Sequence, residues 1–148
     1  RTSAQFISTP LHVALSLFGE PVGVGSQSHI LDGGFEGEGV IALSYPDASV
    51  KIVYSKIRDS MSPSYIVGER GTLFIDKISA PKRVWIERDG GCEELFSSTE
   101  KNNMHHEIRA FCKMAVGEIS PEPYIRLAEL TAKIISEVYE ISGISRYF

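Results

Sequence analysis

The stretch "YSKIRDSMSPSYIVGERGTLFIDKISAP", residues 54–81, contains the end of one β-strand and a complete hairpin. Within it, "SYIVGERGTLFID" (64–76) holds two runs of β-branched and aromatic residues separated by a turn from Gly68 to Gly71. Such runs favour strands, and glycine supplies the backbone freedom that a tight turn needs. This stretch therefore predicts a pair of adjacent antiparallel strands.

Strand patterns continue on both sides of this hairpin. They comprise a strand over 22–30, "GVIALSY" (39–45), "SVKIVYSKI" (49–57) and "RVWIERDGGCEELF" (83–96). Turns are predicted at Pro46-Asp47-Ala48 and at Asp89-Gly90-Gly91. Because the strands are close in sequence and joined by short turns, we expect one antiparallel meander over about 22–97.

Helical patterns flank the strands. Apolar residues recur at helical spacing over about 10–18, with Pro10 in the first turn, Ser8 or Thr9 as the cap, and Gly19 as the stop. A second helix carries the stripe Met104, Ile108, Phe111, Cys112 and Ala115, and a third runs from Ser120-Pro121-Glu122 to Gly143. The predicted fold class is α+β: an open, mainly antiparallel sheet with helices on one face.

The opposite face of such a sheet would remain uncovered. Apolar strand residues such as Val53, Phe74 and Trp85 cannot all point toward the helices. Large exposed apolar surfaces usually mark interfaces. We therefore expect a homodimer through the open sheet face, or contact with a further domain.

Six of the 13 glycines lie in residues 20–40, which raises the question of a phosphate-binding loop. Gly23, Gly25 and Ser28 give Gly-x-Gly-x-x-Ser, but a strand pattern follows where a dinucleotide site needs a helix. The second cluster, 33–39, contains two glutamates and is not followed by Gly-Lys-Ser/Thr. We interpret the first cluster as a strand and the second as a mobile hairpin loop.

Composition limits the possible classes of function. The 148 residues are 43% hydrophobic and 23% charged, as in an ordinary single globular domain, so residues 1–148 are predicted to form one domain. The net charge of −4 argues against a nucleic-acid partner, and no apolar run has the length of a membrane span. Two cysteines without framework spacing indicate a reducing compartment, most simply the cytoplasm.

Residue chemistry alone does not indicate a complete active site. His105, His106 and Glu107 lack the second-histidine spacing of a zinc site, so no metal is expected. Cys92 follows a turn and is expected to be exposed, whereas Cys112 is expected in the core. We assign no catalytic residue and no cofactor-binding residue to this chain.

Taken together, the motifs resemble the C-terminal domain of the Gfo/Idh/MocA family (glucose-fructose oxidoreductase and inositol dehydrogenase-like proteins). The resemblance covers about residues 10–141. It depends on "ALSLFGEP" before the first strand, the strand ending "YSK", the "GERGTLFID" hairpin and the helix start "NNMHHEIRAF". No single motif is diagnostic, but their order and spacing are fairly specific.

The resemblance implies an NAD(P)-dependent oxidoreductase that acts on a sugar, inositol or related alcohol. The dinucleotide would bind a separate N-terminal Rossmann domain, which is absent from this chain. The present domain would shape the substrate site and form the oligomer interface. Substrate identity and the choice between NAD and NADP are not determined by these residues.

The chain departs from the family at the first helix. Where members often carry an Asp and, four residues later, a His or Tyr, this sequence has Gln5 and Thr9. Neither side chain is a useful acid or base near neutral pH. We therefore expect no turnover by this chain alone, and take Gln5, Thr9, His12 and Lys56 as candidate substrate-binding residues.

Three interpretations remain open at this stage. The chain starts at Arg1 and is expected to be part of a longer oxidoreductase. It could instead be a stand-alone, non-catalytic module for dimerisation or small-ligand binding. An unrelated α+β domain with a ligand pocket between sheet and helices is the third possibility.

Overall fold

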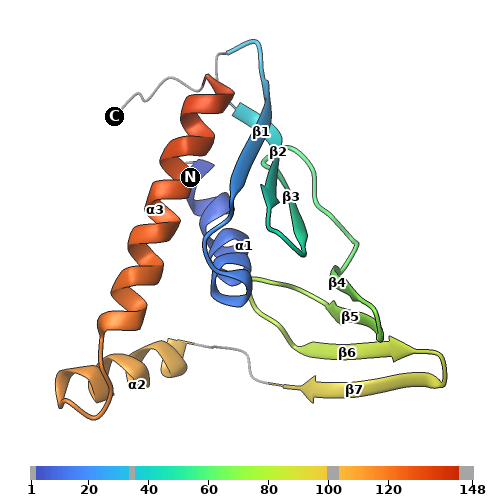
Figure 1. Ribbon diagram of the computed structural model, residues 1–148, viewed down its shortest axis with the longest axis vertical. Coiled ribbons are helices and arrows are strands. Elements are labelled where there is room, and N and C mark those ends of the chain that lie inside the picture. The colour runs from blue at the N-terminus through green and yellow to red at the C-terminus, as the bar shows by residue number, and fades with distance from the viewer. Residues whose placement is uncertain (1–2, 34–35, 100–103, 144–148) are drawn as a thin grey trace. The chain divides into compact units, whose positions relative to one another are not determined.

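The computed structural model describes residues 3–33, 36–99 and 104–143, which form two compact units (Figure 1). The first unit combines the described residues up to Asp59 with those from Glu122 onward, and the second spans Ser60–Pro121. Each unit has its own antiparallel sheet.

The first unit is a two-layer structure. Its sheet has the order β1 (Gly23–Ile30), β2 (Glu36–Ser44) and β3 (Ser49–Ser55), with both pairs antiparallel. The helices α1 (Ser3–Phe18) and α3 (Glu122–Ser142) contact each other and lie on the same side of this sheet (Figure 1).

The hydrophobic core of the first unit lies between the sheet and these two helices. Its buried residues are Ile7, Leu11, Ala14 and Leu15 of α1, Ile41, Leu43, Ile52 and Tyr54 of the sheet, and Ile134 and Val138 of α3. The spacing in α1 follows the helical repeat and the spacing in β2 and β3 follows the two-residue repeat, so each element turns one face inward. Thr9 and His12 of α1 are not part of this core.

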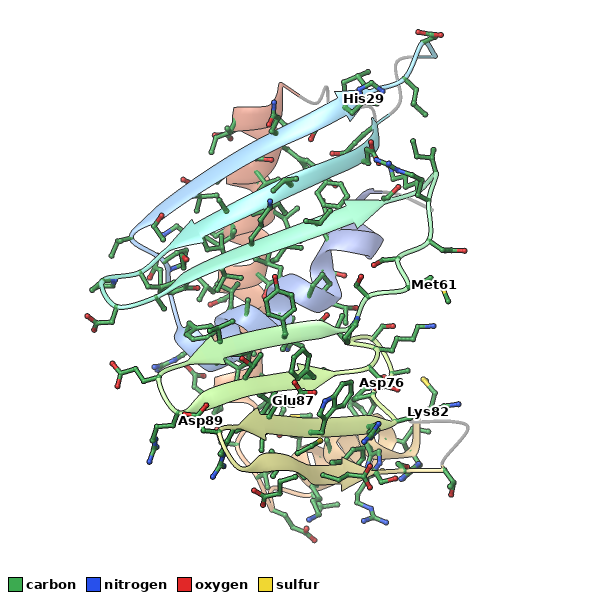
Figure 2. The ribbon with its side chains drawn as sticks, turned by 90° about the vertical axis from the view of Figure 1, so that its right-hand side faces the viewer. His29, Met61, Asp76, Lys82, Glu87 and Asp89 are labelled. Atoms are coloured by element: carbon green, nitrogen blue, oxygen red, sulfur yellow. The ribbon has the colours of Figure 1, made fainter. Side chains whose placement is uncertain are left out.

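The second unit contains the strands β4 (Ser64–Gly68), β5 (Gly71–Ile75), β6 (Arg83–Arg88) and β7 (Gly91–Ser97), paired in chain order, and the helix α2 (Met104–Ala115). Figure 2 shows the four strands side by side. None of the described residues in this unit is fully buried. Its apolar side chains are therefore largely uncovered.

The α+β class, the antiparallel pairing and the predicted turns are confirmed. The strands, however, form two sheets where we expected one continuous meander. The connection from Lys56 to Pro63 contains no described strand and ends in proline, which lacks the N–H that a sheet ladder uses. The ladder that starts at β1 consequently ends with β3.

Three local predictions are corrected by the structure. Helix α1 begins at Ser3, so Pro10 lies inside it and Ser8 and Thr9 do not cap it. The buried stripe from Ile7 onward explains why the helix continues through this proline despite the lost hydrogen bond. Within the expected loop over 33–39, residues 36–39 belong to β2; residues 34–35 lie outside the described part. Cys112 is exposed, because α2 buries none of its residues.

Candidate functional site

Two of the four candidate binding residues lie on the outward face of α1. Thr9 is half-buried and His12 is exposed, whereas Ile7 and Leu11 are fully buried. Gln5 is in the same helix, one turn before Thr9, but its side chain lies outside the described residues. Thr9 and His12 therefore lie outside the buried hydrophobic cluster of this unit.

His12 is held at the contact between α1 and α3. Its Nδ1 lies 3.4 Å from the hydroxyl oxygen of Thr131, which is buried. The Thr131 hydroxyl donates its single proton to the carbonyl of Leu127 at 2.7 Å. A hydrogen bond between the two side chains therefore requires His12 to donate from Nδ1.

Lys56 lies at the end of β3, beside a carboxylate that sequence analysis did not select. Its backbone N–H donates to the carbonyl of Gly37 at 2.7 Å. Its ammonium nitrogen lies 3.9 Å from Oε2 of Glu36. The Glu36 side chain is 1% exposed and the Lys56 side chain 22%, so the carboxylate is the inner member of the ion pair.

Glu36 is held by a cluster of polar side chains, which we call the Glu36 cluster: Ser28, Glu36, Tyr54 and Lys56. The Ser28 hydroxyl donates to Oε1 of Glu36 at 2.8 Å, and the Tyr54 hydroxyl donates to the same oxygen. The other oxygen, Oε2, is buried without a hydrogen-bond partner among the described residues. The ion pair with Lys56 brings a positive charge close to that oxygen, and it offsets part of the cost of burying a carboxylate.

Tyr54 is a donor in this cluster because its environment keeps the phenol protonated. Burial raises the pKa of the Tyr54 hydroxyl above its ordinary value, and the hydrogen bond to the Glu36 carboxylate raises this pKa further. The nearby Ser28 hydroxyl, 3.1 Å from the Tyr54 oxygen, acts on this pKa in the opposite direction. Tyr54 therefore serves as a fixed hydrogen-bond donor near neutral pH and not as a proton acceptor.

A β-bulge explains why Glu36 points inward. His29 pairs with Glu38 and Ile30 pairs with Glu36, so Gly37 is an extra residue in β2. An inserted residue reverses the alternation of side chains on one side of the bulge. Glu36 consequently joins the core-facing side, while Glu38 remains partly exposed and binds Arg58 through hydrogen bonds of 2.6 and 3.0 Å. This Arg58 contact lowers the pKa of Glu38.

The structure therefore brings Lys56 together with Glu36, and His12 together with Thr131. It adds Ser28, Glu36 and Tyr54 to the residues proposed from sequence. A glycine within a strand can mark a bulge, but Gly37 lies in the segment 33–39 that the sequence predicted to be a loop, so this signal was missed. Among the described residues, no cluster of three or more His, Cys, Asp or Glu side chains could hold a metal ion. No helix in the described part of the chain has the length and apolar character needed to span a membrane.

Two curated proteins match nearly the whole chain. It is 31% identical over 132 residues to "Uncharacterized oxidoreductase YgjR" of Escherichia coli (strain K12), covering 88% of the chain and 40% of the relative. It is 35% identical over 137 residues to scyllo-inositol 2-dehydrogenase (NADP(+)) IolU of Bacillus subtilis (strain 168), covering 90% of the chain and 42% of the relative. These matches support a C-terminal domain of the Gfo/Idh/MocA oxidoreductase family.

Solved structures support the same fold for this Gfo/Idh/MocA domain. A "putative oxidoreductase" from Klebsiella pneumoniae matches 90% of the chain with a TM-score of 0.71 at 15% identity, covering 45% of that protein. YvaA from Bacillus subtilis matches 92% of the chain with a TM-score of 0.67 at 13% identity, covering 47% of that protein. No protein-family model matches the chain. The chain spans less than half the length of these relatives.

Proposed function

We propose that the chain is the C-terminal domain of an NAD(P)-dependent oxidoreductase that acts on a sugar, an inositol or a related alcohol. The observation that carries this proposal is the 35% identity to a protein named as an NADP-dependent scyllo-inositol dehydrogenase, over 90% of the chain. In this proposal the two units together form one domain, and the nucleotide binds an N-terminal Rossmann domain of the longer protein. The residues of this chain bind and orient the substrate.

Lys56, His12, Thr9 and Gln5 are the proposed substrate-binding residues. Lys56 offers N–H donors, and a neutral His12 that donates from Nδ1 to Thr131 offers Nε2 as an acceptor. Both groups suit the hydroxyls of a polyol, and both residues lie at least partly at the surface of the first unit. Gln5 and Thr9 stand where many members of the family carry an acid and a base. We therefore propose that the residues of this chain bind the substrate. The isolated chain is not expected to transfer a proton to or from it.

Turnover measurements test this function. We expect the longest natural gene product that contains this chain to reduce NAD(P)+ in the presence of scyllo-inositol or myo-inositol, followed by nicotinamide absorbance. The isolated 148-residue chain should show no turnover under the same conditions. Activity of the isolated chain would contradict the binding-only role. A natural product of the chain's own mass that binds neither nucleotide nor inositol would favour a non-catalytic assembly module.

The open sheet of the second unit is the proposed dimer surface. Tyr65, Phe74 and Trp85 form a cross-strand ladder, with ring centroids 6.3 Å and 5.2 Å apart. Glu87 projects from the same strand face as Trp85, toward the viewer in Figure 2, and accepts a 3.2 Å hydrogen bond from the Trp85 indole. Tyr65 remains 64% exposed. Exposed aromatic side chains of this kind are typical of protein interfaces.

Replacement of Tyr65 tests the proposed homodimer. Burying a carboxylate in an apolar interface is costly, so Tyr65→Glu should weaken dimerisation about 30-fold or more, measured by sedimentation equilibrium. Ile125→Glu on α3, where Ile125 is 48% exposed, introduces the same charge outside the ladder and should leave the dimer intact. A wild-type protein that is monomeric at all concentrations, or equal dissociation by both variants, would reject this surface.

The proposal also includes a cytoplasmic location for the protein. Cys92 and Cys112 are both free and exposed, which suits a reducing compartment such as the cytoplasm. Recovery of the native protein in a membrane or extracellular fraction of its source cells would contradict this part.

A further inference from the structure

We propose that Glu36 is the positioning and charge-balancing residue for Lys56, and that this pair makes the substrate site prefer a neutral polyol over a sugar acid. The inference rests on the proposed function, in which Lys56 binds the substrate. It goes further by naming a residue that acts through Lys56 and the charge class of ligand that the pair selects.

The first support is the difference in burial between the two charges. The Glu36 side chain is almost fully enclosed, whereas about a fifth of the Lys56 side chain reaches the surface. A ligand approaching from solvent therefore meets the ammonium group first, with the carboxylate behind it. At 3.9 Å the two groups interact through their charges, beyond the distance of a normal hydrogen bond.

The second support is that Glu36 cannot easily reorient. Ser28 and Tyr54 both donate to Oε1, which leaves Oε2 directed toward Lys56. Gly39 supplies the space that this arrangement needs, because a Cβ atom there would lie 2.3 Å from the Tyr54 hydroxyl oxygen. A binding group held in this way by hydrogen-bonded neighbours keeps its orientation when the ligand arrives.

The third support is the unmet hydrogen-bonding capacity of Glu36. Buried polar atoms are nearly always hydrogen-bonded, and Oε2 has no such partner among the described residues. A buried carboxylate with an oxygen that lacks a hydrogen bond lowers the free energy of unfolding, whereas an apolar residue in the same place would not. Its charge is therefore best explained by its effect on Lys56.

The charge balance leads to the predicted selectivity. A lysine alone would attract carboxylate and phosphate groups, but an opposite charge 3.9 Å behind it offsets part of that attraction at the distance of a ligand. The N–H donors of Lys56 still suit the hydroxyl oxygens of an uncharged polyol. Removing the negative charge of Glu36 while keeping its shape should shift the preference toward acidic ligands.

The variant Glu36→Gln tests this selectivity in the longest natural gene product, with myo-inositol and glucuronate as the neutral and acidic probes. We expect the ratio of kcat/KM for inositol to kcat/KM for glucuronate to fall about tenfold or more, mainly through KM. Glu38→Gln removes the same charge two residues away, from a carboxylate that pairs with Arg58, and should keep the wild-type ratio. Glu36→Asp retains the charge and should keep most of the preference.

The outcomes separate this inference from the proposed function. Turnover of inositol by the wild type, with the same substrate ratio in Glu36→Gln and Glu38→Gln, would overturn the inference and leave the function standing. If the wild type neither turns over nor binds either probe by calorimetry, the proposed function fails and the inference fails with it. If Glu36→Gln does not fold, Lys56→Gln replaces it, and should shift the ratio in the opposite direction because the uncovered Glu36 charge repels glucuronate.

Discussion

The substitution Ile134→Ala is expected to lower the free energy of unfolding of the first unit by about 2–5 kcal/mol. Ile134 is 2% exposed and packs in the core between α1, α3 and the three-stranded sheet. Truncation removes apolar area from the core and leaves a cavity that the surrounding helices and strands fill only in part. Since a domain is commonly stable by about 5–15 kcal/mol, this change would remove a large share of the total.

A matched substitution on the same helix provides the control. Ile141 belongs to α3 as well, but it is 48% exposed. Ile141→Ala should therefore cost less than about 1 kcal/mol in a urea titration followed by circular dichroism. Equal losses from both substitutions would show that the first unit does not have the core described above.

Gly39→Ala is expected to destabilise the first unit by about 2–4 kcal/mol, although it adds only one methyl group. The new Cβ would lie 2.3 Å from the Tyr54 hydroxyl oxygen and 2.9 Å from the carbonyl oxygen of Gln27. The side chain of Tyr54 must move, which breaks its hydrogen bond to the buried Glu36 carboxylate. The cost therefore combines overpacking with the loss of a charge-assisted hydrogen bond.

Gly25→Ala in the neighbouring strand is the control for Gly39→Ala. A Cβ at Gly25 would meet the Cβ of Ala42 at 3.8 Å, an ordinary contact, so its stability should stay within about 1 kcal/mol of the wild type. The double variant Gly39→Ala/Tyr54→Phe should recover little of the loss, because the ring carbon Cζ would still lie 2.6 Å from the new Cβ and Glu36 would still lack this hydrogen bond. Thermal unfolding of the four proteins measures these differences; a neutral Gly39→Ala would contradict the packing around Glu36.

Local sequence patterns were sufficient for most element boundaries. Gly68 and Gly71 bound the β4–β5 turn, and Gly91 and Gly143, with φ of 137° and 65°, lie where the sequence predicted a turn and a helix end. These features depend on the backbone preferences of a few neighbouring residues, so they are readable without knowledge of distant contacts. The early start of α1 was missed because its buried stripe continues through Pro10, against the local preference of proline.

The candidate site was predicted less completely than the fold. Lys56 and His12 were selected from sequence, and the structure gives each a specific partner in Glu36 and Thr131. Glu36 was interpreted as part of a loop because the segment 33–39 is rich in glycine. Strand alternation would also have placed it on the same side as Glu38, since the pattern does not reveal which glycine is the bulge.

The sequence by itself determined which segments become helices and strands, their antiparallel order and the membership of the Gfo/Idh/MocA family, because these depend on local propensity and on motif order. Only the tertiary structure decided which side chains are buried. It placed Glu36 beneath Lys56 through the bulge at Gly37, and it left α2 and Cys112 exposed. Burial depends on contacts between residues far apart in the chain, such as Ser28 with Tyr54 and His12 with Thr131, and no local pattern contains that information.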